Sequence, residues 1–541
     1  MKIGILSLAR TISIPFLILL VLPTAPAAAG TACFRSAPPY DCDPTGDIDP
    51  ATARTYGDLS VAYANMAWQD FVALNWPAAT GSGGELLPEP SPDHALSYNN
   101  GAYTTVWETY IEARDLFPAD GATPPAFVSE HSLPEICESL GGGSGILLDR
   151  IAKSGTSASS SDEVLDEYIQ ANRMGPVIDV NGNYLRFGIN FNEVMYGYVV
   201  DNKLYNAEGQ EAFDANNPYR NTNPVDWPRG VYSAINDPQD VGSIMLKAAW
   251  RLLTTADDKS RYHTVQAYFY NAGGGVFGQE PTVPESCTLE TAGLVGLHIV
   301  HRSNSSPQWV WSTFEHIDNA PWIYDFESGT PTGPYSLFNP SSCPTVAGAP
   351  SCAYNQLPDH PWNPDLENKT PTQVIRIGAP GYYAEVANKA WHEKILEFYG
   401  ENPWGNYFLV DVQFPTNVAV TNASTGLAEI NPAYPDGLPT PTFLANSTLE
   451  TYIQGFPNLA APPETSNGNV ISIWDQMQNF DVDVSQDTVD PFNVSIFNKS
   501  GGAPRNTSSC ISCHGDAALI TGTSGSFVFS LSRASSEPTA E

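Results

Sequence analysis

Leu294-Val-Gly-Leu-His-Ile-Val-His301 and Trp309-Val-Trp-Ser-Thr-Phe-Glu-His-Ile317 decide the fold class of this chain. Each run is apolar, has the length of a buried strand, and is bounded by Gly, Ser, Asn or Pro. Further runs of this kind are Ile244 to Leu253, Tyr262 to Tyr270 and Tyr407 to Phe414. We therefore predict a large mixed α+β body with a substantial antiparallel sheet and flanking helices.

Local signals add a hairpin and several helices to this sheet. Asn181-Gly182 separates Val177 to Val180 from Tyr184 to Ile189, which predicts a type I′ turn. Apolar residues at helical spacing predict helices over Leu59 to Trp76, Tyr103 to Phe117 and Tyr383 to Tyr399, and a short helix over Leu444 to Gln454. Gly400 should end the third of these helices.

Composition points to a globular protein with an acidic surface. The chain has 541 residues, of which 42% are hydrophobic, and a net charge of −35. Such a surface disfavours nucleic acid and anionic membranes as partners, and it would suit a basic protein that exchanges electrons. Simple solubility outside the cell explains the charge equally well.

The first 29 residues read as a secretory signal peptide. Lys2 and Arg10 give a positive start, Ile12 to Leu22 is a short apolar core, and Ala27-Ala28-Ala29 is a cleavage site. No later segment approaches the roughly 18 apolar residues that a spanning helix needs. We expect a protein of the periplasm, or one secreted further, with no integral membrane span.

Six of the eight cysteines lie outside the segment 510–514. An even number in an oxidising compartment favours disulfides, and six cysteines allow 15 pairings. The short loops favour Cys33–Cys42 and Cys343–Cys352, which leaves Cys137–Cys287. The alternative, a structural metal site, lacks the paired C-x-x-C spacing that zinc sites usually have.

Cys510-Ile-Ser-Cys-His514 is a C-x-x-C-H motif, the signature of covalent c-type haem attachment. Cys510 and Cys513 would form thioethers to the haem, and His514 would be the proximal iron ligand. A redox-active cysteine pair or half of a zinc site are the alternatives. The motif predicts one covalent haem c.

The second axial ligand is harder to predict. Only 27 residues (541 − 514) follow His514, and they contain no Met, His or Lys, so a conventional cytochrome c domain is not expected there. Met477 is the nearest upstream candidate for a distal ligand. His298 and His301 are further candidates, but positions i and i+3 of a strand face opposite sides, so only one could meet a given iron. A five-coordinate iron is the remaining alternative.

The aromatic residues at Trp309 and Trp311 alternate with Val310 and Ser312, as in a strand. Aromatic packing in the core is the simpler interpretation of this pattern. A wall facing the haem is the other.

Several stretches resemble a family of large exported bacterial proteins with one C-terminal C-x-x-C-H motif, commonly described only as cytochrome c family proteins. The stretches are AWQDFVALNWPA (67–78), VWETY (106–110), LKAAWRLL (246–253), GLVGLHIVHRS through WVWSTFEHIDN (293–319) and SCISCHGDAA (509–518). The resemblance implies haem binding through Cys510, Cys513 and His514 and a role in electron transfer. It supplies no substrate.

Together these observations predict three parts: a signal peptide (1–29), a large mixed α+β body (30–500) and a haem-attachment segment (501–541). The favoured function is a periplasmic monohaem c-type protein that passes electrons to a redox protein partner. The alternatives are a peroxidase-like haem oxidoreductase with an open or His-flanked distal site, and a haem-based sensor.

Overall fold

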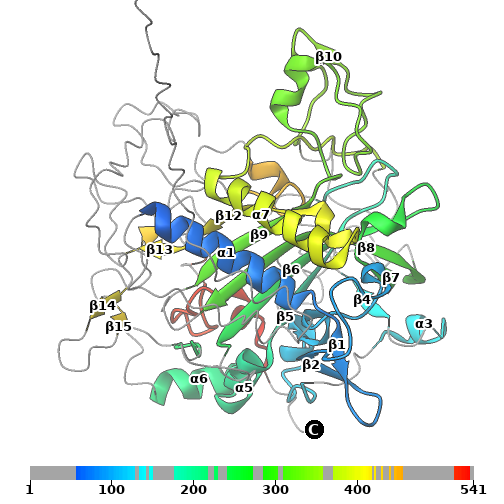
Figure 1. The fold of residues 1–541 in the computed structure, drawn as a ribbon. Coiled ribbons are helices and arrows are strands. Elements are labelled where there is room, and N and C mark those ends of the chain that lie inside the picture. Colours follow the sequence, from blue (N-terminus) through cyan, green and yellow to red (C-terminus); the bar gives the residue numbers. More distant parts are fainter. Residues whose placement is uncertain are drawn as a thin grey trace, which may run out of the picture.

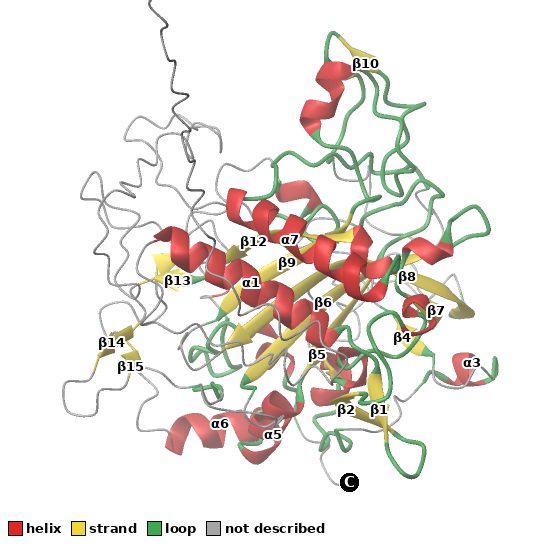
Figure 2. Ribbon diagram, in the orientation of Figure 1, coloured by secondary structure: helices red, strands yellow, loops and turns green. Residues whose placement is uncertain are grey.

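One large sheet with helices packed against it forms the centre of the protein (Figures 1 and 2). The computed structural model describes residues 56–127, 133–141, 145–149, 176–216, 225–229, 241–271, 284–302, 309–356, 369–416, 419–421, 428–430, 438–439, 444–454, 514 and 517–536. The predicted α+β class with an antiparallel sheet and flanking helices is confirmed.

The sheet has eight strands, six of which follow the order β12-β9-β8-β6-β5-β3. β7 pairs with β8, and β4 pairs with β7 as the one parallel neighbour in this sheet. The bounds are β3 Ile111–Glu112, β4 Ile146–Leu148, β5 Arg186–Phe191, β6 Ser243–Leu252, β7 Thr264–Asn271, β8 Ser286–Arg302, β9 Val310–His316 and β12 Tyr407–Gln413.

β8 is the central strand and contains the apolar run from Leu294 to His301. It spans 17 residues, so its first half pairs with β7 and its second half lies between β6 and β9. The segment from Leu294 to Arg302 is buried throughout, because both faces of the sheet are covered there. Burial on both faces explains an almost continuous apolar run in place of alternation. The predicted strands β6, β7, β9 and β12 are confirmed within a few residues.

Helices α1 (Tyr56–Leu74) and α7 (Tyr382–Tyr399) lie side by side across one face of the sheet (Figure 1). Trp68 and Phe71 of α1 contact Phe314 of β9, with ring centroids 5.1 and 4.3 Å apart. The indole of Trp68 donates to Asn388 of α7 at 3.0 Å. The two predicted helices are thus confirmed, and Gly400 ends α7 at φ 69°.

Shorter elements surround this core. The helices are α2 Ala113–Leu116, α3 Glu135–Glu138, α5 Glu193–Asp201 and α6 Ala207–Asn216. Two-stranded pairs are β1 Ala78–Thr80 with β2 Leu86–Pro90, β10 Thr345–Val346 with β11 Ala349–Pro350, β13 Pro415–Thr416 with β16 Leu438–Pro439, and β14 Ala419–Thr421 with β15 Ala428–Ile430. Among the described residues, no helix has both the length and the apolar content needed to span a bilayer.

The predicted helix over Tyr103 to Phe117 is wrong. The segment divides into a 3₁₀ turn (Trp107–Thr109), β3 and the single turn of α2. Glu108 accepts a hydrogen bond from the backbone N–H of Thr105 at 2.6 Å and contacts His263 at 2.7 Å. The long-range contact with His263 and the pairing of β3 with β5 outweigh local helix propensity.

Two further local predictions need correction. Near Asn181-Gly182 the chain turns and Ile178 bridges Tyr184, but Gly182 alone of the pair has a positive φ, so the turn is not type I′. The segment Leu444 to Gln454 contains only a 3₁₀ turn, Thr451–Ile453. There the Asn446 amide donates to Thr313 Oγ1 and Phe314 O, both at 2.9 Å, which competes with helix formation.

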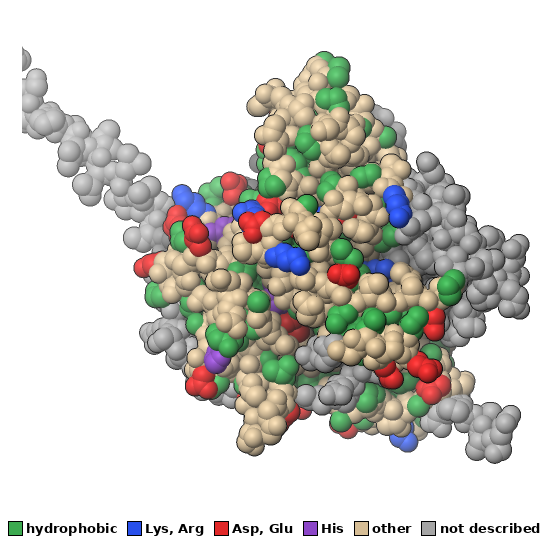
Figure 3. Space-filling model, turned by 90° about the vertical axis from the view of Figure 1, so that its right-hand side faces the viewer, with side chains coloured by type: hydrophobic (Ala, Val, Ile, Leu, Met, Phe, Trp, Pro, Cys, Tyr) green, Lys and Arg blue, Asp and Glu red, His purple; other side chains and the backbone are tan. Residues whose placement is uncertain are grey.

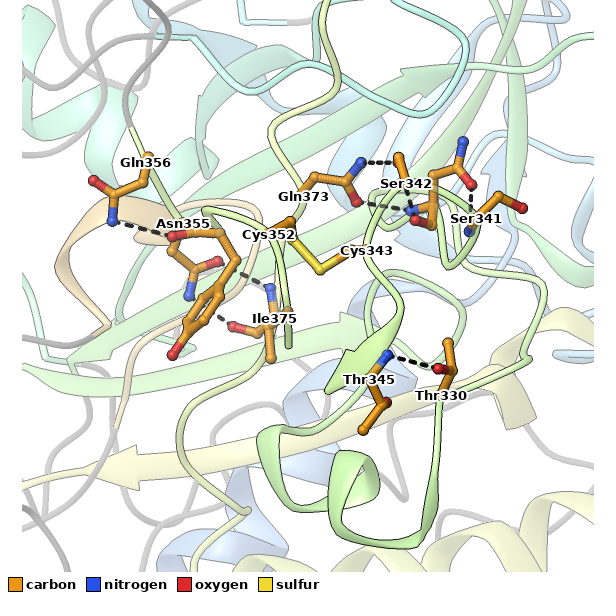
Figure 4. The surroundings of a disulfide bond; sticks show 12 residues. Thr330, Ser341, Ser342, Cys343, Thr345, Cys352, Asn355, Gln356, Gln373 and Ile375 are labelled. Atoms are coloured by element: carbon orange, nitrogen blue, oxygen red, sulfur yellow. Dashed lines mark hydrogen bonds between the residues drawn. A yellow bond between two sulfur atoms is a disulfide. The ribbon is translucent and has the colours of Figure 1, made fainter. Parts of the chain in front are cut away.

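Two of the three predicted disulfides are present. Cys137–Cys287 ties α3 to the start of β8. Cys343–Cys352 closes a small lobe around β10 that projects at the top of Figure 1. Around this disulfide, side-chain amides of Asn355 and Gln373 hold neighbouring backbone groups (Figure 4).

Some predictions fall on parts of the chain that are not described. These are the signal peptide, Cys33–Cys42, Met477, and the thioether cysteines Cys510 and Cys513.

The view from the right-hand side of Figure 1 shows acidic side chains in several small groups and fewer basic ones (Figure 3). This distribution is in keeping with the net charge of −35.

Candidate functional site

The haem motif is represented in the structure by His514, which lies between two aromatic rings. The imidazole centroid is 4.4 Å from the indole of Trp311 on β9 and 5.1 Å from the ring of Phe529. Trp311 is only 5% exposed. The predicted proximal ligand therefore lies against the sheet, and the buried Trp311 serves both core packing and contact with His514.

A backbone carbonyl fixes the orientation of His514. Its Nδ1 lies 2.9 Å from the carbonyl oxygen of Phe527. A carbonyl can only accept, so Nδ1 carries the proton, and the neutral imidazole has its lone pair on Nε2. This is the arrangement in which metal-ligating histidines are usually held, since the second hydrogen bond sets both the tautomer and the ring orientation.

The Phe527 carbonyl is presented by an unusual backbone. Ser526 and Phe527 have φ values of 48° and 73°, in the left-handed region that side chains other than glycine rarely adopt. Such residues cost free energy and persist where the surrounding structure enforces them. Here the enforcing contacts are two buried indoles: Trp309 donates to Ser526 O at 3.0 Å and Trp227 donates to Gly525 O at 3.4 Å.

Helix α6 holds the rest of the segment 517–536 in place (red in Figure 1). The buried amide of Gln210 donates to Leu531 O at 2.8 Å and accepts from the N–H of Ile520 at 2.9 Å. The backbone N–H of Ala207 donates to Ser535 O at 3.0 Å. Gln210 thus ties the segment that orients His514 to the body, although its partners Ile520 and Leu531 lie 310 and 321 positions further along the sequence.

The backbone bond from Ala207 to Ser535 and the bridge between Asn206 and Ser535 close the far end of this segment. Together with Gln210 they leave the carbonyl of Phe527 in a fixed position relative to the sheet. The geometry at His514 therefore depends on contacts far away in the sequence.

Two buried hydrogen-bond donors beside His514 have no partner among the described residues. They are the indole Nε1 of Trp311 and the hydroxyl Oγ of Ser526. Trp311 contacts the His514 ring, and Ser526 precedes the residue whose carbonyl orients it. A haem brings both an iron for Nε2 and carboxylate acceptors for such donors, so these residues fit the group that the motif implies.

The register of the sheet separates the two histidines of β8. Trp311 is directly opposite Val300, and His298 is two residues from Val300, so His298 lies on the same face as Trp311. His301 lies on the other face, toward α1. The expectation that only one of the pair could face a given group is confirmed.

Both histidines pair with buried carboxylates. His298 Nε2 lies 2.9 Å from Glu450 Oε1, and His301 Nδ1 lies 3.0 Å from Asp70 Oδ2. His301 Nε2 is also 2.9 Å from the carbonyl of Val241, to which it must donate. Burial raises the pKa of Asp70, although His301 opposes that shift. His301 is thus held in the helix–sheet interface.

Other histidines serve the core. His316 Nε2 lies 2.9 Å from Arg261 O while Nδ1 accepts from the N–H of Asp318 at 3.1 Å, and burial lowers the pKa of His316 to about 4. His263 lies between Gly101 O and Glu108, at 2.5 and 2.7 Å. Over the described ranges, no group of three His, Cys, Asp or Glu residues is arranged to hold a metal ion.

Comparison with known proteins adds no further assignment. No protein-family model, no curated protein and no solved structure matches this chain.

Sequence reasoning missed the residues that orient His514. Ser526 and Phe527 lie in a segment without periodicity, and neither is a glycine, asparagine or aspartate, the residues that usually adopt a positive φ. Their positive φ values and carbonyl contacts arise from Trp227 and Trp309, which are distant in sequence. The one available signal was the alternating pattern around Trp309 and Trp311.

Proposed function

We propose that this protein is an exported monohaem c-type protein that transfers electrons. Cys510 and Cys513 would hold one haem covalently, and His514 would be the proximal ligand. The haem, when bound, supplies an iron that cycles between ferrous and ferric states. The polypeptide would position His514, shield it from water and dock a redox protein partner.

The hydrogen bond between His514 Nδ1 and Phe527 O carries this proposal. It leaves the Nε2 lone pair as the metal-binding position of the neutral imidazole and holds the ring in one orientation. Trp311 and Phe529 restrict the imidazole further by ring contacts. A histidine with a purely structural role would not need this motif immediately before it.

Export is supported by the signal-like residues 1–29 and by the two disulfides, since disulfides persist in oxidising compartments. A periplasmic location follows for a c-type haem. The proposed class is the one that the sequence resembles, large exported cytochrome c family proteins with a C-terminal C-x-x-C-H.

Replacing Cys510 and Cys513 by Ala tests the proposal directly. The wild-type protein, expressed with its own signal peptide in a host that matures c-type cytochromes, should retain one haem after denaturation. The double variant should retain none. A matched control, Cys343→Ala with Cys352→Ala, also removes two cysteines but should keep the haem. The proposal would be contradicted if both double variants kept the haem, or if the wild-type protein had none.

A haem-dependent oxidoreductase is a second candidate, favoured by the position of His298. This residue lies on the sheet face that carries Trp311 and pairs with Glu450, and a His–carboxylate pair can hold or move a proton. Peroxide turnover by the haem protein that falls at least roughly tenfold in His298→Leu, but not in His392→Leu, would favour this function over simple electron transfer.

A further inference from the structure

Trp311 differs in its hydrogen bonding from seven other buried tryptophans. The indole N–H groups of seven tryptophans donate to protein acceptors: Trp68, Trp76, Trp107, Trp227, Trp309, Trp391 and Trp404. The N–H of Trp311 is buried and has no acceptor within the described part of the chain. Trp311 is also the tryptophan whose ring contacts His514.

Ser526, the neighbour of Phe527, supplies a second buried donor without an acceptor among the residues described. The hydroxyl of Ser526 is buried and has no partner in the ranges the structure describes, although the backbone carbonyl of this residue accepts from Trp309 at 3.0 Å. Buried donors are normally satisfied, because leaving one unpaired costs its full desolvation free energy. Two such donors beside a proposed metal ligand therefore indicate an acceptor that binds there.

The surroundings favour an anionic acceptor. Arg302 is on the same sheet face as Val300 and Trp311, is fully buried, and donates to Asp226 at 2.9 Å and to Trp227 O at 2.6 Å. Burial lowers the pKa of Arg302 to about 10, because desolvation outweighs the attraction of Asp226. A buried guanidinium on this face of the sheet favours an anionic acceptor over a cationic group.

We propose that Trp311 Nε1 and Ser526 Oγ donate hydrogen bonds to a carboxylate of the haem, one of its propionates. A carboxylate has two oxygens and accepts from two donors, and hydrogen bonds to a charged acceptor are the stronger kind. Trp311 and Ser526 are thus positioning residues for the cofactor, separate from the ligand and the thioethers. The inference rests on the proposed function, because it requires a bound haem.

The test compares four holo proteins: wild type, Trp311→Phe, Ser526→Ala and the control Trp391→Phe. Trp311→Phe keeps an aromatic ring in this position and removes the indole N–H. Trp391→Phe makes the same change at a buried tryptophan of α7, whose N–H already donates to Asn65 Oδ1 at 3.0 Å. Covalent haem content is measured first, then the propionate bending bands by resonance Raman spectroscopy, and then the ferrous-to-ferric ratio at one fixed applied potential.

We expect the propionate bands to shift in Trp311→Phe and in Ser526→Ala and to stay in place in Trp391→Phe. The ferrous-to-ferric ratio should fall by up to roughly tenfold in the first two variants, because a less neutralised carboxylate favours ferric iron. If Trp311→Phe does not fold, Ser526→Ala decides by the same bands. If both variants kept the propionate bands of the wild type, the inference would be overturned, while covalently bound haem would still support the proposed function. If the wild-type protein carried no haem, both would be overturned.

Discussion

His298 and His301 are three residues apart on β8 and face opposite sides of the central sheet. His298 lies on the face of Trp311, and His301 meets Asp70 of α1 on the other face. Because side chains alternate between the two faces along a strand, these two histidines contact different parts of the protein. His301 belongs to the packing of helix on sheet, and His298 to the side on which His514 lies.

Replacing His301 by Leu should destabilise the protein by about 3–5 kcal/mol, since Asp70 would be left buried without its charged or hydrogen-bonding partner. Urea unfolding followed by fluorescence measures this loss. The double variant Asp70→Leu with His301→Leu should recover a large part of it. A single variant within about 1 kcal/mol of wild type would show that the pair does not stabilise the interface.

Met477 remains a prediction for the distal ligand, and the absorption spectrum of the holo protein tests it. If a thioether binds ferric iron, the holo protein should be low-spin and show a sulfur-to-iron charge-transfer band. Met477→Ala should then remove that band and make the iron accessible to cyanide. Met245→Ala is a suitable control, because Met245 is a buried residue of the sheet and not the predicted ligand. An unchanged band in Met477→Ala would assign the ligand elsewhere.

The two disulfides should differ in how much they stabilise the protein. Cys137–Cys287 closes a loop with a sequence separation of 150, and Cys343–Cys352 one of 9. Chain entropy predicts a loss of about 5 kcal/mol for the first and about 3 kcal/mol for the second when both cysteines become Ala. Denaturant unfolding of the two double variants makes the comparison. Equal losses would mean that local strain or residual structure dominates.

His316 should make stability depend on pH. Burial holds its pKa at about 4 in the folded protein, below the ordinary value near 6.5, so the unfolded chain binds the proton first as the pH falls. The contribution is fully present above pH ~6.5 and is lost between pH ~6.5 and ~4, by roughly 3 kcal/mol. His316→Gln should reduce the slope of unfolding free energy against pH in that window. An unchanged slope would assign the dependence to other groups.

The strands were predictable because their chemistry is local. Apolar runs such as Leu294 to His301 remain strands wherever both faces are covered, and α7 follows from its own periodicity and Gly400. The segment Tyr103 to Phe117 was not predictable in this way, because Glu108 contacts His263, far along the chain. At the candidate site the motif names His514, but only the fold brings it to Phe527, Trp311 and Ser526.

Gln210 also has a consequence for the order of assembly. Its amide donates to the carbonyls of Leu204 and Leu531 and accepts from Ile520, and the partners Ile520 and Leu531 lie 310 and 321 positions later in the chain. These two hydrogen bonds can form only after the C-terminal part of the chain has been made. Attachment of the proposed haem to Cys510 and Cys513 and the docking of residues 517–536 onto α6 would therefore both belong to the last stage of assembly.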